Sequence, residues 1–216
     1  GWPFILGGGA NLVVADSGME QPVLYLGDLN RIERDGDARI VVDAGAAISD
    51  ATVQAAELGL GGLDFLYSMP GSTGGAVWMN ARCYGSEVAD VLSYVDYLNE
   101  YGAVQRYVPS KGDFAYKRSP FQYRDRVILR AAFNLIPETP DAIWDRMRQS
   151  HADREGKGHF RFPSAGSMFK NNRDFGEPSG KIIDRASLRG FQIGGARIAD
   201  WHGNIFINAG GATARD

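Results

Sequence analysis

The sequence has little cysteine, no long apolar run and no strong excess of charge of either sign. Its 216 residues contain one cysteine, Cys83, which excludes a disulfide framework and a cysteine-rich metal site. A single cysteine also fits a reducing compartment, and we expect a cytoplasmic protein. No apolar run approaches the roughly 20 residues that are needed to span a bilayer. The formal net charge of -3 gives no sign of binding to nucleic acid or to an anionic membrane.

The sequence also lacks a recognisable metal-binding motif. No cluster of histidine, cysteine, aspartate and glutamate has the spacing of a metal site, so we expect no metal. Hydrophobic residues make up 44% and charged residues 23%, a globular composition without a disordered segment. Glycine is the abundant residue instead. It occupies 28 of the 216 positions, about 13%, against a usual ~7%. The glycines gather at 7–9, 59–62, 71–75, 194–195 and 210–211, which indicates tight turns or close approach of the backbone to a ligand.

Strands and helices are expected in irregular order, so the predicted class is mixed α+β. We expect helices at 48–58, 140–154 and 179–187, each with an apolar stripe or a start and stop signal. The expected strands are 4–6, 12–14, 23–26, 31–34, 39–43, 91–98, 104–108, 127–135, 191–193 and 205–207.

Two glycine-rich segments are candidate phosphate sites. Gly7, Gly8, Gly9, Ala10 and Asn11 follow a predicted strand, and three residues without side chains let successive N–H groups point at one oxyanion. The segment has neither the dinucleotide-binding nor the P-loop pattern. By itself, it is equally consistent with a plain turn.

The second glycine-rich segment is Met69-Pro70-Gly71-Ser72-Thr73-Gly74-Gly75-Ala76. It adds two hydroxyl groups, and Pro70 presets one backbone angle. Two such loops favour a ligand with two phosphates, such as a dinucleotide cofactor. A pair of ordinary turns is the alternative.

Several motifs in order along the chain resemble those of the UDP-N-acetylenolpyruvoylglucosamine reductases. Besides the glycine loops, they are 62–66, Met79-Asn80-Ala81 with Tyr84-Gly85, 116–119, 165–171, 188–196 and 202–208. The resemblance covers nearly the whole chain. It implies an FAD-binding domain of the FAD-linked oxidase (PCMH-like) type, followed by a smaller α+β substrate-binding domain. The implied boundaries are 1–24 for a remnant of the first FAD-binding subdomain, 25–155 for the second and 156–216 for the substrate domain.

The implied activity is reduction of the enolpyruvyl ether of UDP-N-acetylglucosamine to UDP-N-acetylmuramate, with FAD as cofactor and NADPH as co-substrate. We also expect a monomer. By similarity, the FAD-binding residues are Gly7, Gly8, Gly9, Ala10, Asn11, Pro70, Gly71, Ser72, Thr73, Gly74, Asn80 and Arg154. The implied substrate contacts are Tyr84, Tyr116, Lys157, Asn171, Arg189 and His202.

Ser167 matches the proton donor of the family. Addition of hydride to one alkene carbon leaves enolate-like charge, so the other carbon must be protonated. Serine is a weak acid and needs close placement and electrostatic help; on residue type alone, Ser167 would be a turn or cap residue.

Lys117 stands where the family usually has an arginine, and we expect it to be the cation that polarises the substrate carboxylate or enolate. The alternative is an ordinary solvated lysine on the surface. Arg82 is a second departure, because glycine is usual there.

The resemblance also implies what is missing. We expect that the chain lacks the start of the first subdomain and the C-terminal part that carries a catalytic glutamate. The short stretch between Lys117 and Ser167 indicates the branch without a tyrosine-bearing insertion. Two alternatives stay open: an FAD-linked oxidoreductase of the same fold with another substrate, and a non-catalytic nucleotide-binding protein.

Overall fold

A computed structural model describes residues 2–122 and 125–216 and divides them into two compact units. Unit 1 holds the residues up to Gly9 together with Gln21–His151, and unit 2 holds Ala10–Glu20 together with Ala152–Asp216. The predicted subdomain boundaries at 24 and 155 remain predictions.

The centre of unit 1 is a five-stranded antiparallel sheet. Its order is β3 (Ile32–Arg34), β4 (Arg39–Asp43), β10 (Val127–Asn134), β8 (Leu92–Leu98) and β9 (Val104–Tyr107). Ala131 of the central strand faces Val42 on one side and Val95 on the other. All three side chains are fully buried, because the alternating pattern of these strands turns one apolar face toward the core.

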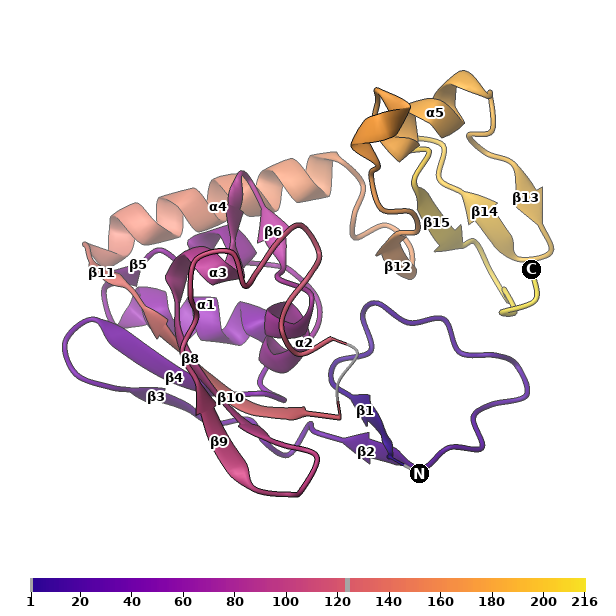
Figure 1. The fold of residues 1–216 in the computed structure, drawn as a ribbon. Coiled ribbons are helices and arrows are strands. Elements are labelled where there is room, and N and C mark those ends of the chain that lie inside the picture. The colour runs from indigo at the N-terminus through magenta and orange to yellow at the C-terminus, as the bar shows by residue number, and fades with distance from the viewer. Residues whose placement is uncertain (1, 123–124) are drawn as a thin grey trace. The chain divides into compact units, whose positions relative to one another are not determined.

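Helices cover one face of this sheet (Figure 1). Helix α1 (Ile48–Glu57) buries a stripe of small and apolar residues, and α2 (Thr73–Trp78) contacts β10 and β4. Helix α4 (Pro140–Gly156) begins with a proline that has no N–H to lose, and it packs Ile143 and Met147 against Ala56 of α1.

The remaining elements of unit 1 are short. They are the parallel pair β1 (Phe4–Leu6) and β2 (Val23–Tyr25), the antiparallel pairs β5 (Leu60–Gly61) with β11 (Ile136–Pro137) and β6 (Arg82–Cys83) with β7 (Ser86–Glu87), the helix α3 (Val88–Val91) and the 3-10 turn η1 (Asp64–Leu66).

Unit 2 contains a four-stranded antiparallel sheet. Its order is β12 (Ser164–Ser167), β15 (Ile205–Asn208), β14 (Ala196–Ile198) and β13 (Gln192–Ile193), accompanied by the 3-10 turn η2 (Arg173–Phe175) and the helix α5 (Ser179–Arg185). Ala199, Ile205 and Ile207 form its small buried core.

The mixed content of helix and strand confirms the predicted α+β class. The predicted strand at 12–14 is wrong: these residues form no strand and are exposed. Three apolar residues without a partner strand cannot satisfy their backbone groups in a sheet. Helix α2 was missed, because its two glycines disfavour a helix by propensity.

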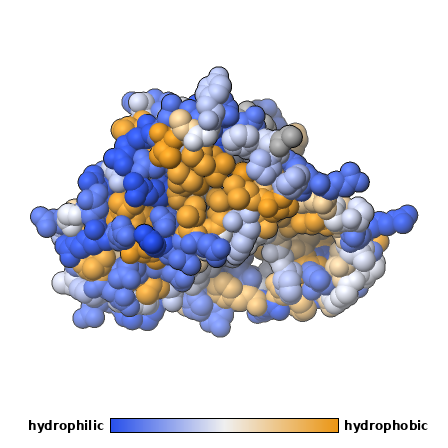
Figure 2. All heavy atoms as spheres, turned by 90° about the horizontal axis from the view of Figure 1, so that it is seen from below, coloured by the Kyte–Doolittle hydropathy of each residue, from blue (hydrophilic) through white to orange (hydrophobic). Residues whose placement is uncertain are grey.

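Strand β2 is exposed throughout, with Val23, Leu24 and Tyr25 each more than 40% accessible. Figure 2 shows apolar residues on the face of the molecule that is seen from below. Apolar surface of this kind commonly marks a contact area.

Within the described residues, no helix is long and apolar enough to cross a membrane.

Candidate cofactor and substrate site

The two glycine loops lie directly against each other in unit 1. A Cβ atom on Gly7 would stand 2.2 Å from Oγ of Ser72, and one on Gly8 would stand 2.8 Å from Cα of Gly71. Gly8 therefore packs on the backbone of the second loop and Gly7 on the side chain of Ser72, which only residues without side chains allow. The structure thus brings together two segments that are more than sixty residues apart in the sequence.

Backbone donors remain available at this junction. Among the hydrogen bonds of the described residues, none uses the N–H groups of Gly7–Gly9, Gly71 or Ser72. By contrast, the N–H groups of Thr73 and Gly74 each donate to a carbonyl at 2.8 Å, those of Ala46 and Ala44. A cluster of backbone donors with no protein acceptor fits the diphosphate of a dinucleotide.

The second glycine loop is held by its own side chains. Ser72 caps α2, and its Oγ accepts the N–H of Gly75 at 3.3 Å. Thr73 is fully buried and donates its hydroxyl to the carbonyl of Ala46 at 3.0 Å. Gly74 has no room for a side chain, because its Cβ would lie 2.9 Å from that of Ala44. Thr73 and Gly74 therefore shape the loop, and Pro70 is exposed at its start.

Asn80 has a structural place in this unit. It is fully buried, its Nδ2 donates to the carbonyl of Ala115 at 3.1 Å, and its Oδ1 accepts the N–H of Ala89 at 3.1 Å. The amide thus joins three segments of the chain. Its predicted contact with the cofactor remains a prediction.

Lys117 lies at the corner of a tight turn. Ala115 and Arg118 exchange backbone hydrogen bonds of 3.1 and 3.0 Å, which leaves Tyr116 and Lys117 at the tip. Lys117 has a φ of 56°, a left-handed value that is uncommon outside glycine. Gln122 stabilises the turn by donating to the carbonyl of Lys117 at 3.1 Å. The turn therefore presents Tyr116, which is 46% exposed, and the partly buried Lys117 from a fixed backbone.

Tyr84 also has a left-handed backbone, with a φ of 51°. Its hydroxyl donates to the carbonyl of Ser150 in α4 at 3.0 Å, while 47% of the residue stays exposed. Asp64, Phe65, Tyr84, Ser86, Arg146, Gln149 and Ser150 line an open cavity of about 360 Å³ beside it.

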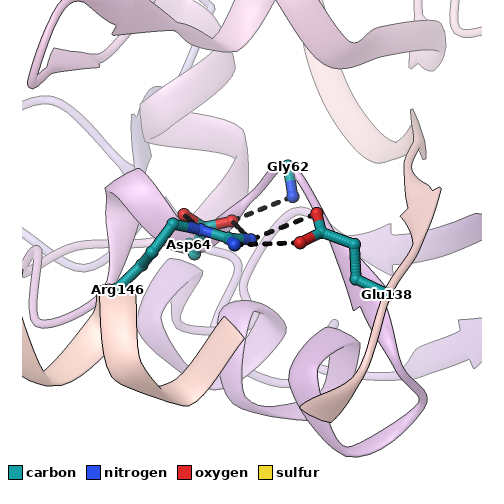
Figure 3. Close-up of polar contacts among 4 residues, drawn as sticks. All are labelled: Gly62, Asp64, Glu138 and Arg146. Carbon is teal, nitrogen blue, oxygen red and sulfur yellow. Dashed lines mark hydrogen bonds and ion pairs between the residues drawn. The ribbon is translucent and has the colours of Figure 1, made fainter. Parts of the chain in front are cut away.

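An ion-pair network fastens α4 to the rest of unit 1 (Figure 3). Arg146 donates from Nε to Asp64 at 3.0 Å and from Nη1 to Glu138 at 2.9 Å. The N–H of Gly62 donates to Asp64 at 2.9 Å. Burial would raise the pKa of Asp64, but the hydrogen bonds from Arg146 and Gly62 outweigh it and lower the pKa below 3.8.

Ser167 ends strand β12 in unit 2. The pairing of β12 with β15 is irregular between Ser164 and Ser167, and Gly166 in that interval has a φ of 80°. Its N–H donates to Oγ of Ser164 at 2.8 Å. Ser167 is exposed on this irregular strand. Such an irregularity can re-aim one side chain away from the regular ladder, as active sites often require.

The residues after Ser167 are held by Asn204. Its carbonyl accepts the N–H of Met168 at 3.0 Å, and its side chain exchanges hydrogen bonds of 2.9 and 2.8 Å with the backbone of Phe169. Asn204 is 4% exposed and was not singled out in the sequence. It lies within the 202–208 motif, but the sequence does not reveal its role, because Phe169 is 35 positions away.

Arg154 has a buried donor that no described residue satisfies. Its Nε has no hydrogen-bond partner, and its guanidinium lies 5.7 Å from the centre of the Phe160 ring. An unsatisfied buried donor costs about 1–3 kcal/mol, which an acceptor on a ligand would offset. Lys157 is exposed and pairs with Asp153 at 2.6 Å.

The other predicted substrate contacts already have partners in unit 2. The side chain of Asn171 accepts the N–H of Ser179 at 3.0 Å. Arg189 forms two hydrogen bonds with Asp184, which lower the pKa of that carboxyl. Nδ1 of His202 accepts the N–H of Asn204 at 3.0 Å, so in the neutral ring Nε2 carries the proton.

The predicted site residues divide between the units. Gly7–Gly9, the second glycine loop, Asn80, Tyr84, Tyr116 and Lys117 belong to unit 1, whereas Ala10, Asn11, Arg154, Lys157, Ser167, Asn171, Arg189 and His202 belong to unit 2. The structure brings the two glycine loops together within unit 1. The predicted roles of the individual residues remain predictions.

Comparison with known proteins finds two family models that match this chain. Residues 3–107 match the family described as FAD binding domain, and residues 158–216 match the C-terminal domain of UDP-N-acetylenolpyruvoylglucosamine reductase. The reductase of this name from Borrelia garinii is 43% identical over 99% of this chain and 70% of its own length. That of Borreliella burgdorferi is 42% identical with the same coverage.

A solved structure shows the same fold. The UDP-N-acetylenolpyruvylglucosamine reductase of Thermus caldophilus superposes with a TM-score of 0.86 at 33% identity, over 99% of this chain and 77% of that chain. These matches confirm the predicted two-part fold and FAD as the cofactor. The chain therefore belongs to the UDP-N-acetylenolpyruvoylglucosamine reductase family.

Proposed function

We propose that the protein reduces the enolpyruvyl ether of UDP-N-acetylglucosamine to UDP-N-acetylmuramate, with NADPH as the source of hydride, in the synthesis of peptidoglycan precursors. Membership in the reductase family supports the reaction. The observation that carries the proposal is the junction of Gly7–Gly8 with Gly71–Ser72, which leaves backbone donors without protein acceptors.

The FAD diphosphate is assigned to the N–H groups at this junction. Arg154 of unit 2 is a separate contact that the family resemblance assigns to the cofactor. When bound, FAD supplies the hydride-transfer chemistry that no amino-acid side chain provides. Thr73 and Gly74 keep the second loop in shape through their bonds to Ala46 and Ala44.

Ser167 is assigned the proton transfer. After hydride has reached one alkene carbon, the O–H bond of Ser167 breaks and its proton forms a C–H bond at the other carbon. Lys117 stabilises the negative charge that develops on the enolate and carboxylate. Its φ of 56° fixes the backbone from which the side chain extends.

The contacts with the sugar nucleotide are assigned residue by residue from the family resemblance, each within its own unit. These are Tyr84 and Tyr116, with Lys157, Asn171, Arg189 and His202. His202 can offer its Nε2 proton to an acceptor, because Nδ1 is already engaged by Asn204. Lys157 is paired with Asp153 and Arg189 with Asp184. To bind substrate oxygens, each cation must leave its aspartate or contact the aspartate and the substrate together.

Steady-state kinetics on the intact protein test the reaction. The proposal predicts NADPH oxidation that depends on the enolpyruvyl sugar nucleotide, with one lactyl ether formed for each NADPH consumed. A yellow protein that oxidises another substrate with oxygen would instead be an FAD-linked oxidase. A colourless protein that neither binds FAD nor turns over would be a nucleotide-binding module.

We further propose that the enzyme acts in the cytoplasm as a monomer without nucleic-acid or membrane partners. The single cysteine and the modest net charge of -3 support this assignment. Light scattering at working concentration measures the mass directly, and a stable dimer would contradict the monomer.

A further inference from the structure

Ser68 has an unusual backbone just before the second glycine loop. Its φ is 59°, in the left-handed region that non-glycine residues rarely occupy. Such a conformation persists only where the surroundings impose it. Two polar contacts do so here. The N–H of Ser68 donates to Oγ of Ser49 at 3.0 Å, and Oγ of Ser68 shares a hydrogen bond of 2.7 Å with Nδ1 of His151.

His151 comes from a distant part of unit 1. It lies in α4, 83 positions after Ser68. Its ring centre is 6.0 Å from that of Tyr67, and Tyr67 meets Trp144 of the same helix edge-on at 6.0 Å. The imidazole is therefore held in place by packing as well as by its polar contact. The hydrogen bond to Ser68 joins α4 to the start of the glycine loop.

This contact bears on the backbone donors of the loop. Ser68 is followed by Met69 and Pro70 and then by Gly71 and Ser72, whose N–H groups have no acceptor among the described residues. Two backbone hydrogen bonds hold the chain after Ser68. The N–H of Met69 donates to the carbonyl of Leu66 at 3.1 Å, and the N–H of Ile48 donates to the carbonyl of Gly71 at 3.1 Å. The backbone of Ser68 therefore helps to set the direction in which the chain enters Gly71 and Ser72.

We propose that Ser68 and His151 are positioning residues that hold the second glycine loop in the conformation that binds the FAD diphosphate. This inference rests on the proposed function. In this proposal both residues act through the loop. The pair makes a preset loop, which loses less entropy on binding than a free one.

The experiment measures FAD affinity and thermal stability of the intact apoprotein in matched variants. His151→Phe keeps an aromatic ring against Tyr67 but removes the nitrogen. His151→Asn restores a polar group near the position of Nδ1. Ser68→Gly removes the hydroxyl and at the same time relieves the left-handed strain. Asp145→Ala removes an exposed side chain of the same helix and is the control.

We expect His151→Phe and Ser68→Gly each to raise the dissociation constant of FAD about fivefold, the effect of one lost hydrogen bond. Ser68→Gly should do so without a fall in the melting temperature of the apoprotein. The double variant should bind no more weakly than the weaker single variant, because both remove the same contact. His151→Asn should recover most of the affinity.

Unchanged FAD affinity in His151→Phe, with a lower melting temperature, would overturn the inference and leave His151 as a packing residue. Additive losses in the double variant would overturn it too. Absence of FAD binding in the unaltered protein would overturn the proposed function together with this inference, so the two failures are distinguishable.

Discussion

At the residue scale, the site depends on positions where a side chain is absent. Gly8 faces the backbone of Gly71 and Ser72, and a Cβ there would lie 2.8–3.0 Å from three of their backbone atoms. Backbone atoms at such a distance cannot move aside as a flexible side chain can. The space that Gly8 leaves open is therefore part of the contact between the two loops.

Gly8→Ala tests this contact. The added methyl group should push the loops apart, at a cost of about 1–3 kcal/mol in FAD binding, or roughly 5- to 150-fold in the dissociation constant. A fluorescence titration with FAD measures it. Gly156→Ala is the control, because that position has open space and an ordinary φ. Equal affinity in both variants would contradict the account.

The sequence revealed these glycines but not all of their neighbours. The two clusters were visible as candidate phosphate sites, because glycine at successive positions has few other uses. Ser68, Asn204 and the structural contacts of Asn80 could not be predicted, since their partners lie on distant segments. Only the fold shows the hydrogen bond between His151 and Ser68.

At the element scale, α4 is the helix whose placement depends on polar contacts. Arg146 joins it to Asp64 of η1 and to Glu138, the residue that follows β11. The side chain of Asp64 is 15% exposed, so loss of its partner would leave a largely buried carboxylate. Helix α2 shows the opposite case: a glycine-rich segment becomes helical because Ser72 caps it and Ala44 leaves room only for glycine at position 74.

Arg146→Ala should destabilise the protein by about 2 kcal/mol at neutral pH, because two carboxylates lose their partner. The folded pKa of Asp64 is lowered, so its contribution is present above the ordinary value of 3.8 and is lost as pH falls through the folded value. The stabilities of the variant and the unaltered protein should therefore begin to converge as pH falls below 3.8, and should meet only below the folded pKa of Asp64.

Urea unfolding at neutral and acid pH measures both effects. Arg148→Ala removes an exposed ion pair of the same helix and should change stability little at either pH. A loss for Arg146→Ala that is equally large at acid pH would show that packing rather than charge causes it.

At the scale of the whole molecule, the family motifs predicted the fold better than the prediction of single helices and strands did. The motif order pointed to the family, and the matches over 99% of the chain confirm it. Element by element, the result was weaker. The strand at 12–14 was wrong and α2 was missed, because three apolar residues or a glycine pair carry little information without their tertiary neighbours.

Binding of FAD should stabilise the protein. At a free concentration one hundred times the dissociation constant, the gain is about 2.7 kcal/mol, or roughly 5 to 10 °C in melting temperature. Riboflavin lacks the diphosphate and should stabilise far less at the same concentration. Differential scanning fluorimetry compares the two, and an equal shift with riboflavin would contradict the assignment of the glycine loops to the diphosphate.

The most direct test of the proposed reaction is an anaerobic absorbance record of the FAD-loaded intact protein and of its Ser167→Ala variant. The account predicts that NADPH bleaches the flavin in both. Addition of the enolpyruvyl sugar nucleotide should then restore the colour in the unaltered protein and fail to do so, or do so at least about a hundredfold more slowly, in the variant. Bleaching by NADPH without recovery in the unaltered protein would show that this flavoprotein has a different acceptor.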